Sequence, residues 1–299
     1  MGCDHGKTVE GSGKENKGYP VCRNTIELTK LVYSMVAYDQ DRIILGAIDE
    51  IQIFDCKTKN ITSLSSEHKG RINHITKLSN GQFATAGQDK LIKIWKIDSK
   101  ESLMTLSGHK SMIWSINEIK GNKLISGSSD NTALIWDLNK KKLDFELLKD
   151  KEISVVLQLK SGKVILCSSK QLILFDLDSK KQLTNFGVEP GVWAIKELYD
   201  GRVAAGQGNG DISILEVGNQ IIEKFVLKGH KKTVNCIIEL ENHKLVSSSD
   251  ENYMILWNLN DPESKYILEG HTSKVTYLTH LSGNKFASVS SDKTLKIWE

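Results

Sequence analysis

The sequence predicts an all-β protein built from seven repeated, four-stranded antiparallel sheets. One position recurs through the chain: an apolar or aromatic residue that ends a short alternating run, at Phe54, Trp95, Trp136, Phe175, Leu215, Trp257 and Trp298. Consecutive members of this series are 39 to 42 residues apart. Short alternating runs bounded by turn residues indicate strands. A fixed period of about 40–45 residues made only of strands predicts a seven-bladed β-propeller, with one blade for each repeat.

The third repeat, residues 108–137, shows the elements expected of one blade. It contains three alternating runs, separated by turns at Gly121-Asn122 and Asp130-Asn131, which predict a three-stranded meander. An outer strand precedes it at 102–106, and the sixth repeat has an equivalent strand at 224–228. Because one such sheet is too small to bury its own faces, we expect neighbouring blades to cover them.

The two ends of the chain predict how the propeller is closed. Residues 1–23 are polar and rich in Gly and Lys, which predicts a flexible tail ahead of a propeller domain at 24–299. Residues 24–30 form an isolated strand candidate, and the last repeat stops at Trp298-Glu299, straight after its third strand. We therefore expect strand 24–30 to complete the last blade, which removes exposed sheet edges.

The repeated residues resemble those of the WD-repeat family over 24–299. Gly-His occurs at Gly108-His109, Gly229-His230 and Gly270-His271, with Glu67-His68 as a near match. A turn Asp recurs in four repeats, and the closing pair Trp136-Asp137 has variants in most of the others. The resemblance implies a seven-bladed propeller that is closed by strands from both termini.

The resemblance also implies a structural role for the repeated polar residues. The His, the turn Asp and the closing Trp are expected to join a strand Ser or Thr in a hydrogen-bonded network that makes the sheet rigid. Because the set recurs in several repeats, we expect no catalytic residue among its members. The expected sets are His68, Asp89 and Trp95; His109, Asp130 and Trp136; His230, Asp250 and Trp257; and His271, Asp292 and Trp298.

The resemblance places a partner-binding face around the start of each inner strand and just before the turn Asp. Aromatic residues, Met and Arg at such positions are the types enriched at protein interfaces. Four of the six tryptophans close strands, which leaves Trp114 and Trp193 over. The alternative is that these two are core residues of inner strands. The protein-binding candidates are Tyr33, Arg71, Asn73, Met112, Trp114, Trp193, Asn235 and Lys274.

Charge and cysteine content narrow the class of protein. The net charge is +3, with 40 basic and 37 acidic residues, so a nucleic-acid partner is disfavoured. The five cysteines, Cys3, Cys22, Cys56, Cys167 and Cys236, are odd in number and lack paired spacing. We expect free thiols in a reducing compartment, a cytoplasmic location, and neither a metal nor a cofactor.

The first functional hypothesis is a non-enzymatic scaffold or adaptor that binds other proteins, as a monomer or as a subunit of a complex. A second is a membrane-attached signalling or trafficking adaptor, which requires acylation at Gly2 and Cys3. A third is the substrate receptor of a ubiquitin ligase, although no Arg follows the closing pairs at the spacing that such receptors use. An enzyme at the channel mouth is the fourth, and it would need an acid, base or nucleophile set that occurs once.

Overall fold

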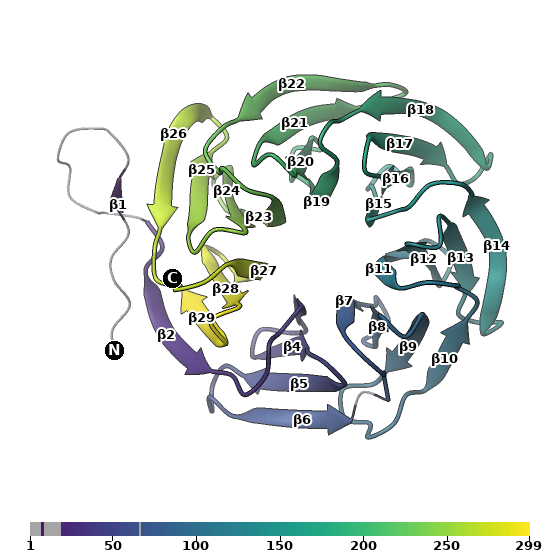
Figure 1. The fold of residues 1–299 in the computed structure, drawn as a ribbon, viewed down its shortest axis with the longest axis horizontal. Coiled ribbons are helices and arrows are strands. Elements are labelled where there is room, and N and C mark those ends of the chain that lie inside the picture. The colour runs from purple at the N-terminus through teal and green to yellow at the C-terminus, as the bar shows by residue number, and fades with distance from the viewer. Residues whose placement is uncertain (1–6, 9–18, 66) are drawn as a thin grey trace. The chain divides into compact units, whose positions relative to one another are not determined.

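The computed structural model describes residues 7–8, 19–65 and 67–299, and this part of the chain contains strands and no helix. Seven antiparallel sheets follow one another along the sequence, and each consists of four consecutive strands or their equivalent. The fold is therefore the predicted all-β, seven-bladed β-propeller (Figure 1). In each blade the strands are called inner, middle, third and outer, in the order of their pairing. The entrance end of a blade is the end at which its inner strand begins, and the far end is the opposite one.

The chain separates into two compact units. One unit holds Tyr33–Trp193 and Glu216–Ile222, and it contains blades 1 to 4. Blade 1 consists of β3 (Ser34–Ala37), β4 (Arg42–Gly46), β5 (Glu50–Asp55) and β6 (Ile61–Ser65). Blade 2 consists of β7 (Ile72–Lys77), β8 (Phe83–Gly87), β9 (Leu91–Trp95) and β10 (Met104–Ser107). Blade 3 consists of β11 (Ile113–Ile119), β12 (Lys123–Ser128), β13 (Ala133–Asp137) and β14 (Lys142–Leu148). Blade 4 consists of β15 (Val155–Gln158), β16 (Val164–Cys167), β17 (Gln171–Asp176) and β18 (Lys181–Gly187).

The other unit holds the chain up to Val32, Ala194–Leu215 and Glu223–Glu299. The fifth sheet consists of β19 (Val192–Glu197), β20 (Val203–Gln207), β21 (Ile212–Val217) and β22 (Ile221–Leu227). Blade 6 consists of β23 (Val234–Leu240), β24 (Lys244–Ser249), β25 (Met254–Asn258) and β26 (Asp261–Leu268). Blade 7 consists of β27 (Val275–Ser282), β28 (Lys285–Ser290), β29 (Thr294–Trp298) and β2 (Cys22–Glu27).

Blade 7 takes strands from both ends of the sequence, as the closure prediction requires. β2 pairs antiparallel with β29, from Cys22 opposite Trp298 to Glu27 opposite Thr294. The strand begins two residues earlier and ends three residues earlier than the predicted 24–30. The predicted domain boundary after residue 23 consequently falls inside β2.

A fifth strand extends the sheet of blade 6. β1 (Lys7–Thr8) pairs antiparallel with the outer strand β26, opposite Ile267 and Tyr266. The ring of Tyr19 stacks on that of Tyr266, with centroids 4.3 Å apart. The possible acylation residues Gly2 and Cys3 lie outside the described residues, so the acylation hypothesis stays a prediction.

The hairpin turns have the backbone conformation that their residues favour. Between β11 and β12, Gly121 has φ 84° and Asn122 has φ 56°. Two consecutive residues with positive φ match the twist of the flanking strands, and Gly and Asn adopt this conformation at the lowest cost.

The core lies between adjacent blades. Blades 2 and 3 share a cluster in which Ala84 and Ile92 of one blade pack with Ile113, Ile116 and Trp136 of the other. Comparable clusters join blades 1 and 2, blades 3 and 4, and blades 6 and 7. In these pairs the sheets bury faces against one another, as expected of sheets that are too small to be stable alone.

The cysteines differ from the expectation at one position. Cys56, Cys167 and Cys236 are free thiols, but Cys22 is disulfide-bonded, so the expectation of free thiols throughout is wrong for this residue. Cys3 lies outside the described residues. In the described part of the chain, no group of His, Cys, Asp or Glu has a metal-binding arrangement. A separate search of the same residues found no helix with the length and apolarity needed to cross a membrane.

Candidate functional site

The polar set of blade 3 forms one continuous hydrogen-bonded chain. His109 Nδ1 lies 2.7 Å from Asp130 Oδ2, and His109 Nε2 lies 2.6 Å from Ser126 Oγ. Trp136 Nε1 donates to the same Ser126 Oγ at 2.8 Å. An ionised carboxylate can only accept, so Nδ1 carries the proton. Burial disfavours a second proton on the ring, and Nε2 of the neutral imidazole accepts from the serine hydroxyl, so both nitrogens are satisfied.

Burial explains the protonation states in this set. It lowers the pKa of the His109 imidazole, and Asp130 only partly offsets this effect. For Asp130, burial by itself raises the pKa. Hydrogen bonds from the Thr132 side chain, the Lys110 backbone and His109 outweigh burial and hold this pKa below its ordinary value. A neutral imidazole therefore lies against an ionised carboxylate, an arrangement that suits a buried hydrogen-bonded network with a structural role.

Blades 2 and 7 repeat the arrangement. In blade 7 the distances are 2.8 Å from His271 to Asp292, 2.7 Å from His271 to Ser288 and 2.8 Å from Trp298 to Ser288. In blade 2 a threonine replaces the serine, and the distances are 2.8 Å from His68 to Asp89, 2.7 Å from His68 to Thr85 and 2.8 Å from Trp95 to Thr85.

In blade 6 the predicted acid is wrong. His230 Nδ1 lies 2.8 Å from Glu251 Oε2, and Asp250 takes no part in the set. Burial by itself raises the pKa of Glu251, but hydrogen bonds from His230, Tyr253 and Ser249 outweigh it and lower this pKa to about 2. Asp250 instead accepts a hydrogen bond from Asn235 Nδ2 at 3.2 Å.

The spacing of the acid from the histidine and the tryptophan of each repeat identifies Glu251. In blades 2, 3 and 7 the acid follows the histidine by 21 residues and precedes the tryptophan by six. Applied to His230 and Trp257, the same spacing gives Glu251 and not Asp250. The longer glutamate side chain reaches the same place in the blade.

These sets are closed to substrate. The His109 side chain is 0% exposed and that of Asp130 is 6% exposed, and their polar atoms are occupied by each other and by the backbone. A catalytic acid or base has to reach a reacting atom, which these groups do not. The arrangement can join the loops of one blade to its middle and third strands.

A second hydrogen bond is repeated at the entrance ends of five blades. A small polar side chain at or next to the first residue of the inner strand donates to a backbone carbonyl at, or two residues before, the start of another inner strand. We call these five bonds the entrance latches. They are Ser34 to Ile72 at 2.8 Å, Asn73 to Ile113 at 2.9 Å, Ser154 to Val192 at 2.9 Å, Asn235 to Val275 at 3.2 Å and Thr276 to Val32 at 3.2 Å.

The entrance latches assign a structural contact to two predicted binding residues, Asn73 and Asn235. The sequence analysis missed the latches as a set. The available signal was a Ser, Asn or Thr at the same place in five of the seven repeats.

Tryptophan occupies the latch position in the other two repeats. The Trp114 side chain is half-buried, and its Nε1 donates to Ser129 Oγ at 2.6 Å and to Glu152 Oε1 of blade 4 at 3.2 Å. Trp193 is 48% exposed. Within the described residues, its indole N–H has no hydrogen-bond acceptor. Trp193 is therefore a surface residue, whereas Trp114 lies between the surface and the core.

The remaining predicted binding residues are also at entrance ends. The Arg71 guanidinium lies over the ring of Tyr33, 5.3 Å from its centroid. Met112 is half-buried just before β11, and its carbonyl accepts from Ser128 Oγ at 2.9 Å. Lys274 Nζ lies 3.7 Å from Asp250 Oδ1, and both side chains are largely exposed.

Comparison with known families agrees with this geometry. The family model for the WD domain, G-beta repeat, matches residues 50–96, 100–137, 222–258 and 262–299, together more than half of the chain. These four segments contain the acid-bearing turns of the four histidine sets described above. A search of curated proteins gave no match to the chain. The matched repeats and the seven-bladed fold show that the chain belongs to the WD40 family.

Proposed function

We propose that this protein is a non-enzymatic scaffold that binds other proteins at the entrance ends of its blades, with Trp193 as the principal anchor. Propellers of the WD40 family generally bind other proteins and are typically non-enzymatic. The observation that carries the proposal is the 48% exposure of Trp193 at a position where five other repeats have a latching polar side chain.

In the isolated chain, Trp193 leaves a large aromatic surface in contact with water. Water in contact with a large aromatic surface is unfavourable, and folding leaves about half of this side chain in water. A partner that covers the ring removes this apolar surface from water, and a partner that also accepts the N–H hydrogen bond adds a polar contribution to binding. Tryptophan is enriched at interface hot spots for these reasons. The fold obtains no hydrogen bond from this indole among the described residues, so the side chain is available to a partner.

Blade 3 supplies a second candidate contact. Trp114, Ser129 and Glu152 form a compact polar group, with Ser129 Oγ 2.5 Å from Glu152 Oε1. Met112 lies next to it in sequence and is half-buried. A partly covered aromatic ring and an adaptable Met side chain are residue types that are enriched at protein interfaces. We propose a cytoplasmic location for this activity, with membrane attachment only if Gly2 and Cys3 are acylated.

The test compares Trp193→Ala with Tyr199→Ala. Tyr199 is a matched control because it is an aromatic residue that is 58% exposed and follows the far end of the same strand, β19. Affinity purification with quantitative mass spectrometry should show partners that are lost with Trp193→Ala and retained with Tyr199→Ala. Replacing an interface hot spot costs about 2 kcal/mol or more, or roughly a thirtyfold loss of affinity.

Both variants should keep the melting temperature of the wild-type protein, because neither side chain is buried. If Trp193→Ala folds normally and retains every partner, then Trp193 is not the anchor.

A further inference from the structure

A pocket lies between blades 3 and 4 at their far ends, away from the residues of the proposed scaffold surface. Four turns surround it, at residues 119–123, 137–144, 158–163 and 176–181. Its volume is about 210 Å³. Small-molecule pockets usually measure about 300–1,000 Å³, so this space is closer to the size of one large side chain.

Apolar side chains line one part of the pocket. Ile119 and Ile135 are buried, and Leu177 and Phe145 are half-buried. All four belong to the cluster that packs blade 3 against blade 4. An inserted apolar side chain would therefore extend an existing core instead of resting on a polar surface.

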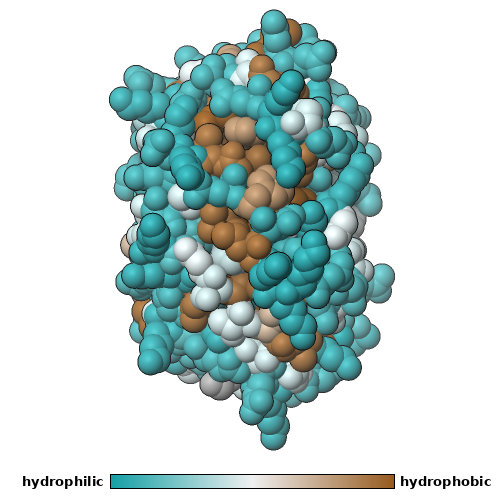
Figure 2. Space-filling model, turned by 90° about the vertical axis from the view of Figure 1, so that its right-hand side faces the viewer, coloured by the Kyte–Doolittle hydropathy of each residue, from teal (hydrophilic) through white to brown (hydrophobic). Residues whose placement is uncertain are grey.

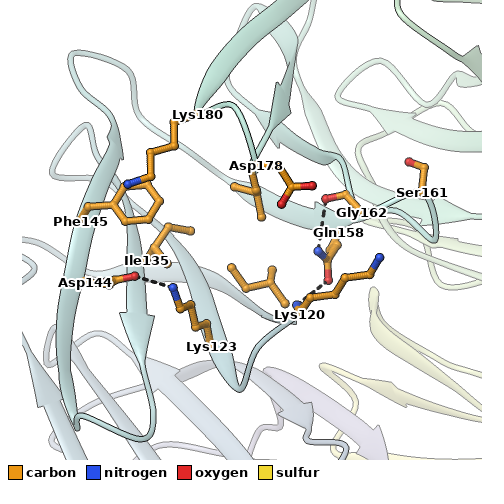
Figure 3. Close-up of a pocket in the computed structure, with 12 residues that line it drawn as sticks. Lys120, Lys123, Ile135, Asp144, Phe145, Gln158, Ser161, Gly162, Asp178 and Lys180 are labelled. Carbon is orange, nitrogen blue, oxygen red and sulfur yellow. Dashed lines mark hydrogen bonds and ion pairs between the residues drawn. The ribbon is translucent and has the colours of Figure 1, made fainter.

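Charged side chains, together with Gln158, Ser161 and Gly162, form the rest of the pocket wall. Figure 3 shows Lys180 folded over Phe145, with the ammonium 4.3 Å from the ring centroid. Lys123 Nζ lies 2.7 Å from Asp144 Oδ2, so the charges of this pair are already balanced. Lys120 also lines the pocket, and its ammonium and that of Lys180 form no ion pair with a carboxylate of the described residues.

The four turns carry a strong local excess of positive charge. They contain nine lysines and four aspartates, an excess of five positive charges in a chain whose net charge is only +3. The lysines come from four separate places in the sequence, and the longest run among them is Lys140-Lys141-Lys142. Two of the four aspartates, Asp144 and Asp137, are paired with lysines at 2.7 and 3.3 Å. We call the pocket and these turns the basic pocket.

Apolar surface is also exposed on the outer parts of these blades. Figure 2 shows a hollowed apolar strip between hydrophilic side chains on the side of the molecule that carries β14. On the outer parts of blades 2, 3 and 4, Leu103, Leu143 and Leu183 are 47, 40 and 38% exposed. Exposed apolar residues that gather beside a charged rim mark interaction surfaces.

We propose that the basic pocket binds an acidic linear peptide of a partner protein, which inserts one large apolar side chain between blades 3 and 4. The excess of lysine attracts the peptide and orients its carboxylates. The pocket then takes one Phe or Leu side chain against Ile119, Ile135 and Leu177. This surface is additional to the entrance-end surface and does not depend on it.

The pocket itself favours a peptide over a polyphosphate or a membrane. Asp144 and Asp178 line the pocket beside the lysines, and this mixture of both charges suits a peptide with spaced carboxylates and an apolar side chain better than the dense negative charge of a polyphosphate. Lys180 covers the ring of Phe145, so this aromatic face is not open for stacking with a nucleic-acid base. A space the size of one side chain, with apolar residues on one part of its wall, matches an anchor residue in a peptide.

Fluorescence anisotropy with two synthetic peptides tests the proposal. One peptide has alternating Asp and Glu residues around a central Phe, and the other has Ser in place of that Phe. We expect the Phe peptide to bind at least about tenfold more tightly, because full burial of a Phe side chain is worth about 1.5–3 kcal/mol. The double variant Lys120→Glu with Lys180→Glu should weaken binding of the Phe peptide at least about tenfold.

The matched control is Lys96→Glu with Lys100→Glu, which makes the same change of charge on exposed lysines in a far-end turn of blade 2. It should change the Kd by less than about twofold. Trp193→Ala should leave peptide binding unchanged, so failure of the scaffold proposal and failure of this one are distinguishable.

Three results would overturn the proposal. Equal binding of the Phe and Ser peptides would show attraction by charge alone. An unchanged Kd in the Lys120→Glu, Lys180→Glu variant would place the peptide elsewhere. Tighter binding to phosphatidylserine vesicles or to a single-stranded RNA than to the Phe peptide would assign the basic pocket to a membrane or a nucleic acid.

Discussion

The role of a single residue in a blade is predicted more reliably from its distance in sequence to the other repeated residues than from its residue type. An Asp in the turn of blade 6 looked equivalent to the other turn aspartates, yet the neighbouring Glu251 bonds His230. The repeat fixes where the side-chain oxygen must be, and a glutamate can reach that place as well as an aspartate. Position relative to His230 and Trp257 is therefore the more useful guide.

This difference between neighbours gives a matched pair of variants. Glu251→Ala removes the carboxylate that accepts hydrogen bonds from His230 and from the hydroxyls of Ser249 and Tyr253. We expect the free energy of unfolding to fall by about 2–4 kcal/mol, as for other disrupted buried networks. Urea denaturation of the purified protein measures this loss.

Asp250→Ala is the control. The Asp250 side chain is 41% exposed, and its ion pair with Lys274 is long, at 3.7 Å. An exposed pair contributes about 1 kcal/mol or less. If the two variants lost the same stability, the assignment of Glu251 to the network would be contradicted.

At the entrance ends, residue type alone does not predict whether a side chain is buried or exposed. Trp114 and Trp193 were recognised as additional tryptophans, but their sequence neighbours are apolar and allowed either a core or a surface position. Exposure depends on what the next blade places against the ring, which no local pattern records. The basic pocket was missed for a related reason, since its lysines come together only when four distant turns fold side by side.

At the scale of the element, small residues in the middle strands allow the blades to approach each other. Gly127 in β12 is an example, because a Cβ built on it would lie 2.5 Å from Ile153 Cγ2 and 2.9 Å from the Ile153 carbonyl oxygen in the next blade. The second of these atoms is backbone and cannot rotate away. No local pattern in the sequence records which small residues lie this close to an atom of the next blade.

Gly127→Ala should consequently destabilise the protein although alanine is small. We expect a loss of about 1–3 kcal/mol, the usual cost of overpacking a core. The matched control is Gly187→Ala in β18, where a Cβ would meet nothing within 4 Å. A thermal melt of both variants measures the difference, and equal melting temperatures would show that blade 4 can shift to accept the methyl group.

Strand existence was predicted better than strand boundaries. The closing strand was expected at 24–30, and the structure has it at Cys22–Glu27. Its start is set by pairing with Trp298, which lies at the other end of the sequence, and not by any local turn signal. After Glu27 the Leu28 N–H still bonds Lys293 O at 2.8 Å, although the strand has ended.

For the whole molecule, blade 7 is the element that joins the two ends of the chain. β2 supplies its outer strand, and the Lys296 ammonium donates to Thr25 Oγ1 at 2.8 Å. Without β2, the backbone groups along one side of β29 lose their partners and β29 becomes an exposed edge. The stability of the protein should therefore depend on a short segment that is remote in sequence from the rest of its blade.

Truncation of the first 27 residues tests this dependence. We expect a loss of several kcal/mol, or about 10 °C or more in melting temperature, together with aggregation during size-exclusion chromatography. A synthetic peptide of residues 19–30 should restore part of the loss. Truncation of the first 18 residues keeps β2 and is the control; if the two truncations melted at the same temperature, closure by β2 would not contribute to stability.

The pairing of β2 with β29 also has a consequence for synthesis of the chain. Thr25 and Lys296 are 271 residues apart. At about 5–20 residues per second, β2 leaves the ribosome roughly 15–50 s before its partner exists. Blade 7 can therefore form only after synthesis of the rest of the propeller, so its closure is a late step of folding.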